Sequence, residues 1–165
     1  MRKFFKLLWV ALAVGLGIWL WGALFPSPEK VVRTRLKEIE ELVSFPPNEK
    51  PFTALTAVQQ LCARLSPHVE VEMDAPGMGQ HKLRGREEVR YQAGLFRSQV
   101  NGAKVEFLDV NVAVASDKQS AETSLTVKAR VSSEPDTIYQ EMKLTFRKLD
   151  GKWLLARAET VKTLR

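Results

Sequence analysis

The chain has 165 residues, of which 45% are apolar and 27% charged, and this length accommodates one globular domain with a short additional segment. Its single cysteine excludes an intramolecular disulfide and a zinc site built on cysteine pairs. The 25 basic and 19 acidic residues alternate along the chain without interleaved aromatic residues, so the net charge of +6 indicates a mixed, solvated surface and no nucleic-acid partner.

The N-terminal region carries the clearest signal of location. Three basic residues are followed by an uncharged run of 19 residues, Leu7 to Phe25. As a helix this run would extend roughly 28 Å at about 1.5 Å per residue, close to the hydrocarbon thickness of a bilayer. The bulky residues before Pro26 disfavour a signal-peptidase site, and Trp19 and Trp21 suit a membrane interface. The run therefore predicts an uncleaved transmembrane helix, with a cleaved signal peptide as the alternative.

The rest of the chain divides into a tether and one domain. We assign residues 1–25 to the anchor, 26–28 to a short proline-containing tether and 29–165 to the domain. A long C-terminal domain translocates largely regardless of its charge, whereas a short basic N-terminus is usually retained in the cytoplasm. We therefore expect a single-pass protein of the cell membrane whose domain lies on the extracytoplasmic (periplasmic) side.

Apolar residues recur at helical spacing in three segments of the domain. We expect one helix over residues 29–45, ended by a proline pair, and a second from Thr53 to Leu65, with Thr53 as its cap and Phe52 packing back onto it. A third helix is expected over residues 86–100, closed by an Asn-Gly pair. The apolar stripes are Val32, Leu36, Ile39 and Val43; Leu55, Val58, Cys62 and Leu65; and Val89, Ala93, Phe96 and Val100.

Elsewhere the pattern has the period of two that is typical of strands. Residues 69–74 alternate apolar and acidic side chains, and a turn over 75–79 leads to a short strand over 80–83. After residue 102 the alternation continues to the C-terminus and predicts an antiparallel meander with one buried and one polar face. The order of elements indicates an α+β fold. The four strands of the meander are expected over residues 105–115, 121–131, 138–148 and 153–162.

Three stretches, Leu65–Val71, Gly85–Val89 and Leu144–Trp153, together with the order of elements, resemble the NTF2-like, or SnoaL-like, superfamily. The resemblance covers residues 29–165. It implies a cone in which about three helices pack on a strongly curved, mainly antiparallel sheet around a central cavity. Some members of the superfamily are isomerases, dehydratases, cyclases or hydrolases that work in this cavity, and others only bind ligands or proteins.

Asp74 is the one candidate catalytic residue that the resemblance supplies. Ketosteroid isomerase uses a carboxylate base with an oxyanion hole of a tyrosine and a protonated aspartate. Asp74 matches the base, but Arg35 or a neighbour stands at the tyrosine position, and the stretch Met142–Leu144 offers no acid. A base without these partners lacks the largest electrostatic contribution to catalysis. The sequence therefore favours a protein that is not an enzyme, and an enzyme acting on a small apolar substrate is the alternative.

One strand carries potential metal ligands at alternate positions. His68, Glu70, Glu72 and Asp74 share a face of the strand over residues 69–74, and His81 could approach from the next strand. Ligands on one flat strand do not converge, so we expect this face to be solvated and predict neither a metal nor a cofactor.

Three polar residues interrupt the apolar alternation of the last two strands. Gln140 precedes apolar residues of the inner face, and Arg157 and Glu159 continue the alternation that begins at Trp153. They are the candidate ligand pocket of the cone. The alternative is a β-bulge near Arg157, which would turn Arg157 and Glu159 to solvent.

These observations favour a membrane-anchored module of the cell envelope that binds a small ligand or another protein. Its expected partners are the membrane, a small apolar ligand, and either a second copy or another envelope protein. The outer sheet face, with Lys128, Arg130, Lys143 and Arg147, is a candidate dimer surface whose charge disfavours a large dry interface.

Overall fold

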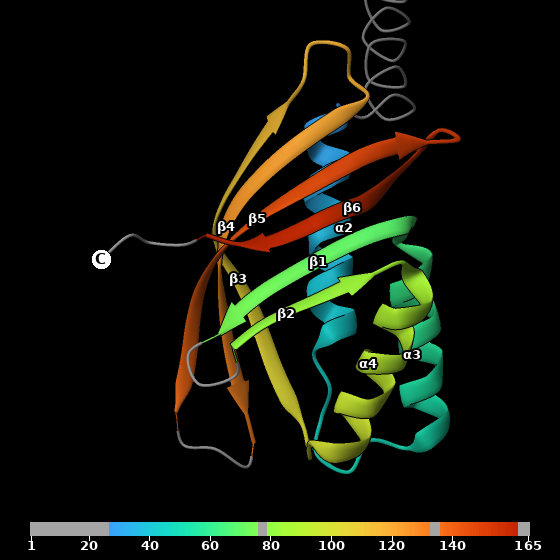
Figure 1. Ribbon diagram of the computed structural model, residues 1–165, viewed down its shortest axis with the longest axis vertical. Helices are drawn as coiled ribbons and strands as arrows, with labels where there is room; N and C mark the ends of the chain where they lie inside the picture. The colour runs from blue at the N-terminus through green and yellow to red at the C-terminus, as the bar shows by residue number, and fades with distance from the viewer. Residues whose placement is uncertain (1–26, 76–78, 133–135, 162–165) are drawn as a thin grey trace, which may run out of the picture.

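The computed structural model describes residues 27–75, 79–132 and 136–161, which form three helices and one six-stranded sheet (Figure 1). The predicted membrane-spanning run lies outside these residues, and no helix among those described is long and apolar enough to cross a bilayer. In chain order the elements are α2 (Pro28–Val43), α3 (Pro51–Ala63), β1 (Leu65–Ala75), β2 (Gly79–Arg84), α4 (Arg86–Gln99), β3 (Ala103–Val114), β4 (Ser120–Val131), β5 (Thr137–Leu149) and β6 (Lys152–Thr160).

The start of α3 differs from the prediction. The helix begins at Pro51 and not after a Thr53 cap, because proline fits the first position of a helix, where its missing N–H would have no partner. The residue before it, Lys50, makes no side-chain cap. Phe52 is 79% exposed, so its expected packing back onto the helix is wrong. α3 ends at Ala63, and Leu65 opens β1.

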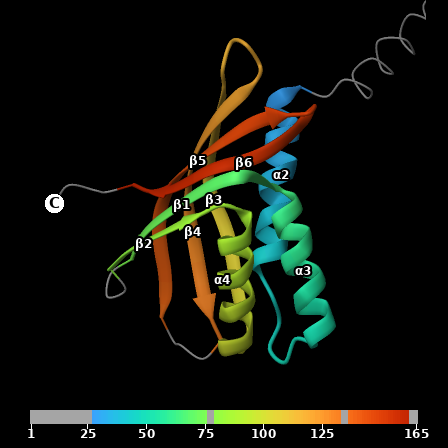
Figure 2. The same cartoon turned by 45° about the vertical axis from the view of Figure 1, so that its right-hand side comes forward.

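The sheet has the strand order β2-β1-β6-β5-β4-β3. The last four strands form the predicted antiparallel meander, and β1 pairs antiparallel with β2. β1 also pairs with β6, the last strand of the chain, and this pair is parallel. The sheet is strongly curved, and the three helices cover one of its faces (Figures 1 and 2).

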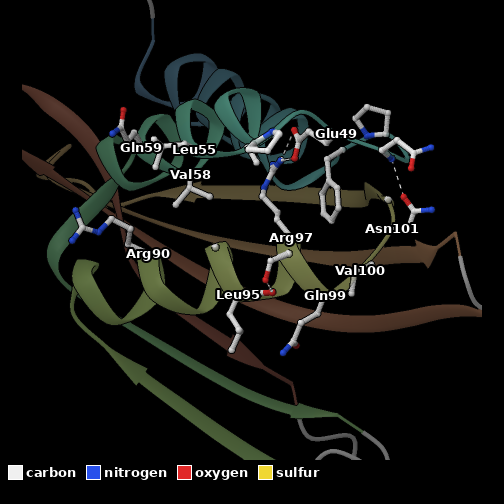
Figure 3. A pocket seen from close by; sticks show the side chains of 18 of the residues that line it. Glu49, Leu55, Val58, Gln59, Arg90, Leu95, Arg97, Gln99, Val100 and Asn101 are labelled. Carbon is white, nitrogen blue, oxygen red and sulfur yellow. Dashed lines mark hydrogen bonds and ion pairs between the residues drawn. The ribbon is translucent and has the colours of Figure 1, made fainter.

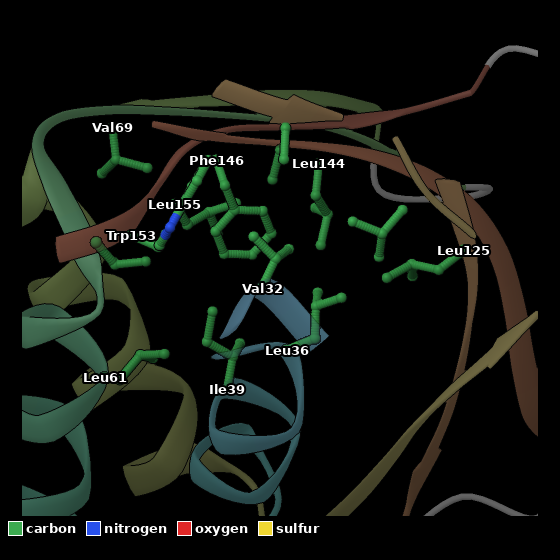
Figure 4. Packing of buried hydrophobic residues seen from close by; sticks show 14 residues of the cluster. Val32, Leu36, Ile39, Leu61, Val69, Leu125, Leu144, Phe146, Trp153 and Leu155 are labelled. Carbon is green, nitrogen blue, oxygen red and sulfur yellow. The ribbon is translucent and has the colours of Figure 1, made fainter. Parts of the chain in front are cut away.

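α2 supplies the helical side of the core. Val32, Leu36 and Ile39 repeat along one side of the helix, are buried, and point toward Leu144 and Phe146 of β5 (Figure 4). Val32 and Phe146 are fully buried, and each such side chain contributes about 1.5–3 kcal/mol relative to an exposed one. The predicted stripe of the first helix is therefore confirmed.

β4 shows which face of the sheet is inside. Ala121, Thr123 and Leu125 are buried, whereas Glu122 and Ser124 between them are exposed. This confirms the predicted division into one apolar and one polar face. Thr123 is fully buried on the inner face, and its Oγ1 has no hydrogen-bond partner within the part of the chain that the structure describes.

Candidate functional site

A groove of about 850 Å³ lies between α3 and α4 (Figure 3). Leu55 and Val58 of α3 point toward α4, Arg90 lies at one end, and Asn101 lies at the other. The segment that joins α2 to α3 lies at the same end as Asn101. Most of the lining is apolar, as in small-molecule and peptide sites, with a few polar groups among it.

α4 forms one wall of the groove and is itself only partly buried. Val89 and Ala93 of the predicted stripe are half-buried, but Phe96 is 45% exposed, and no residue of α4 is fully buried. At Gly94, which lines the groove, a Cβ atom would meet no other atom within 4 Å. The missing side chain of this glycine therefore leaves free space in the wall.

Arg97 fixes α4 to the segment after α2. Its Nη1 lies 2.7 and 2.5 Å from the two carboxylate oxygens of Glu49, and the two side chains are only 5% and 10% exposed. The guanidinium also donates to the backbone oxygen of Leu42 and lies 4.6 Å from the centre of the Phe45 ring. This buried, charge-assisted contact holds the end of the groove in one geometry.

The groove offers binding chemistry more than proton-transfer chemistry. Among its described lining residues, Glu49 is the only carboxylate, and it is held by Arg97. Arg90 at the other end forms an exposed ion pair with Glu87. General acid–base catalysis needs a group that is free to exchange a proton with the substrate, and both of these pairs are engaged. The arrangement suits an apolar group held by contact with α3 and α4.

Two of the predicted site residues lie away from this groove. The backbone N–H of Asp74, near the end of β1, donates to Oγ1 of Thr160 at 3.1 Å. Gln140 is half-buried on the inner face of β5, opposite Val127 of β4, and its Nε2 donates to the backbone oxygen of Glu141 at 3.3 Å. Neither residue lines the groove, and the catalytic role considered for Asp74 and the ligand role predicted for Gln140 stay predictions.

Arg157 and Glu159 lie on the outer face of the sheet. Phe146 pairs with Leu155 and Thr145 pairs with Arg157, so one extra residue of β6 separates the two pairs. This is the β-bulge that the sequence left open as the alternative, and it reverses the alternation that begins at Trp153. The structure therefore does not bring Arg157 and Glu159 together with Gln140.

The outer face holds an ion-pair network around Arg157. Its guanidinium lies 3.3 Å from Glu70, 3.3 Å from Glu72 and 2.9 Å from Glu159. The hydrogen bond and negative charge of Glu159 raise the pKa of Arg157, and the hydrogen bond from Lys82 lowers the pKa of Glu72. Glu70 and Glu72, two of the residues at metal-like spacing on β1, thus face basic partners.

Cys62 has the structural place that the sequence predicted. It is buried on α3, and burial raises the pKa of its thiol. A thiol with a raised pKa is less available as the nucleophilic thiolate.

The groove was not predicted from the sequence, because Leu55 belongs to an apolar stripe that was expected to face the core. Leu55 is 56% exposed at the groove, whereas Val58 and Cys62 of the same predicted stripe are buried. One signal could have indicated a second exposed face: α3 has no charged residue along its 13 positions.

Comparison with known proteins identifies the fold. No protein-family model matches the chain, and no curated protein matches its sequence. An NTF2-like protein of unknown function from Pseudomonas putida superposes with a TM-score of 0.64 at 9% identity, over 83% of this chain and 87% of that one. A candidate scytalone dehydratase from Novosphingobium aromaticivorans gives 0.61 at 18% identity, over 82% and 83%.

A domain with a cystatin-like fold from Nostoc punctiforme gives a TM-score of 0.62 at 16% identity, over 86% of this chain and 80% of that one. The chain therefore has the α+β fold of NTF2-like proteins, in agreement with the predicted fold class. At these identities the likeness describes the fold alone, because one fold carries many functions.

Proposed function

We propose that the chain is a membrane-anchored binding module of the cell envelope, whose groove between α3 and α4 holds an apolar group of a ligand or partner. The observation that carries this proposal is the groove itself: about 850 Å³ with mainly apolar walls. Its geometry is fixed by the buried pair of Arg97 and Glu49, in which the one described carboxylate of the lining is already bound.

The anchoring part of the proposal rests on the apolar run of residues 7–25. Its length matches the hydrocarbon thickness of a bilayer, and the domain follows it after a short tether. We propose that the domain lies on the extracytoplasmic side. Protease added to intact spheroplasts is then expected to digest the domain, and protection of the domain until the membrane is lysed would contradict this orientation.

Catalysis in the cone is the alternative function. Structural neighbours of the chain include proteins named as a scytalone dehydratase and as a dehydratase of the NTF2-like family. If this chain shared such an activity, Asp74 and Gln140 would be the residues to substitute. The groove supports the binding module because its one described carboxylate is engaged with Arg97.

The proposed function is tested by native mass spectrometry of the full chain, extracted from its host membrane in a mild detergent. We expect a bound apolar molecule or a protein partner. In Gly94→Trp the indole would occupy the groove, and the bound species is expected to be lost. Gly94→Ala is the matched control, because a single methyl group leaves the groove open and retention should continue.

Two results would contradict the proposal. Retention that is equal in Gly94→Trp and Gly94→Ala would place the binding site elsewhere. Retention that is lost in Asp74→Asn or Gln140→Ala, and not in Gly94→Trp, would move the function to the inner face of the sheet and favour the enzyme.

A further inference from the structure

The face formed by α3 and α4 carries a protruding aromatic side chain beside a hollow. Phe52, in the first turn of α3, is 79% exposed. Leu55, three residues later and so on the same side of the helix, lines the groove and is 56% exposed. Across the groove Tyr91 of α4 is 66% exposed. Large apolar side chains that gather on one exposed face mark an interaction surface.

α3 also differs from the rest of the chain in charge. None of its 13 residues is charged, although 27% of the chain is, and about three or four charged residues would be expected at that frequency. Its exposed polar positions are neutral, as at Thr53, Gln59 and Gln60. Depletion of charge together with exposed aromatic residues is the composition of the centre of a protein–protein interface.

An uncharged helix can contact its own copy without like-charge repulsion. Around a two-fold axis, each residue near the axis faces the same residue of the other subunit, so a charged residue there meets a like charge. α3 avoids this repulsion. A protruding side chain and a hollow on one face also satisfy the second condition of a two-fold contact, in which the same patch must supply both halves.

The charges that line the groove are paired within one copy. Arg97 is paired with Glu49, and Arg90 is paired with Glu87 at the other end. The described lining therefore presents no uncompensated side-chain charge that would select a strongly charged partner. This neutrality also favours a second copy over an acidic or basic peptide.

From these observations we propose that the partner of the groove is a second copy of this chain. The two α3 helices cross antiparallel about a two-fold axis, and Phe52 of each copy enters the groove of the other. The inference rests on the proposed function and identifies the apolar group that the groove binds.

The antiparallel crossing follows from the position of Phe52 and from one nearby charge. A 13-residue helix is about 20 Å long, so Phe52 near one end reaches the far half of the opposite α3, where Val58 and Gln59 line the groove. The same crossing separates the two exposed Lys50 side chains, which precede the helices at opposite ends. A parallel crossing would place these two cations side by side.

The size of the contact sets the strength of the predicted dimer. One buried phenylalanine removes about 150–250 Å² from water, whereas a stable interface buries about 1,200–2,000 Å² in total. Two Phe52 side chains supply part of this area. Leu55, Tyr91 and the exposed glutamine side chains of α3 would supply more. We therefore expect a reversible dimer. It is best detected in the membrane, where anchoring raises the local concentration of the domain.

The test is photo-crosslinking of the full chain in its own membrane. Benzoyl-phenylalanine, which keeps the aromatic shape, replaces Phe52, and two differently tagged copies are expressed together. Irradiation is expected to give a product that carries both tags and has twice the chain mass of 18.7 kDa. Mass spectrometry of the product should place the crosslink on α3 or α4 of the other copy.

Two variants and two controls locate the contact. Gly94→Trp fills the groove without removing a contact and is expected to lower the yield of the double-tagged product about tenfold, whereas Gly94→Ala leaves the yield unchanged. Leu55→Lys, at an exposed position, places like charges near the two-fold axis and should lower the yield as well. The same photo-reactive residue at Tyr139, which is 62% exposed on β5, should give no double-tagged product.

The outcomes separate this inference from the proposed function. A crosslink from Phe52 to a different protein, or a monomer whose groove retains a small molecule, overturns the dimer and leaves the binding function in place. A double-tagged product that is insensitive to Gly94→Trp and Leu55→Lys overturns the proposed geometry. Absence of any crosslink together with an empty groove overturns both.

Discussion

The buried pair of Arg97 and Glu49 gives a quantitative test of how the groove is held. We consider Arg97→Met, which keeps the length of the side chain and removes its charge and hydrogen bonds. The variant leaves the Glu49 carboxylate, itself only 10% exposed, without its partner, and it removes the hydrogen bond to Leu42 and the contact with the Phe45 ring. The loss therefore combines an unpaired buried charge with an unpaired carbonyl.

The magnitude follows from burial. Removing one partner of a buried ion pair costs about 3–5 kcal/mol, and the cation–π contact adds about 1 kcal/mol, part of which the apolar methionine recovers by packing. We expect Arg97→Met to lower the free energy of unfolding by about 4 kcal/mol. For a domain of this size 1 kcal/mol shifts Tm by roughly 3–5 °C, which gives a decrease of about 12–20 °C.

The assay is urea and thermal unfolding of residues 27–165, monitored by circular dichroism. Arg90→Met is the matched control on the same helix, because Arg90 and Glu87 form an ion pair in which the side chains are 56% and 74% exposed. This exposed pair should be worth less than about 1 kcal/mol. If Arg97→Met were within 1 kcal/mol of Arg90→Met, the argument that burial makes the Arg97 pair structural would be refuted.

Three further predictions concern other parts of the domain. Thr123→Val should raise stability by about 1 kcal/mol in urea unfolding, because it replaces a fully buried hydroxyl, which has no partner among the described residues, by a methyl group of similar size; a loss of stability would contradict this. Gly94→Ala should raise Tm, since alanine favours the helix by about 0.5–1 kcal/mol and its Cβ meets no atom. Hydrogen bonds from Lys104 and then Lys128 lower the pKa of Glu106 from 4.5 to about 2, so its stabilising contribution is present above pH 4.5 and is lost as the pH falls toward 2. Glu106→Gln should flatten the dependence of Tm on pH in this range, and an unchanged slope would count against the ion pairs.

Periodicity in the sequence predicted most of the elements, because the spacing of apolar side chains reflects the geometry of each element. Val32, Leu36 and Ile39 repeat at helical spacing and are buried on α2. Ala121 and Leu125 are buried on β4 while Glu122 between them is exposed. The Asp150-Gly151 turn joins β5 to β6 as expected, with both residues at positive φ.

The candidate pocket residues were harder to predict, because their direction depends on pairing between strands. Arg157 continues the alternation of Trp153 in the sequence, but a single extra residue in β6 reverses it. The reversal turns Arg157 toward Glu70 on β1, a strand that is distant in the sequence and becomes its neighbour only through the parallel pair. Gln140 kept its predicted inner-face position because no bulge interrupts its pairing from β5 to β4.

The groove depended on tertiary structure for a related reason. α3 has apolar residues on more than one side, and the sequence alone does not say whether Leu55 or Val58 meets the core. In the folded chain Val58 is buried, and Leu55 lies at the open groove beside α4, which Arg97 holds to Glu49. The sequence by itself determined the elements, their order and the polar face of the sheet, since these depend on local spacing. Only the folded chain decided which side chains converge, because convergence depends on contacts between residues that are far apart in the sequence.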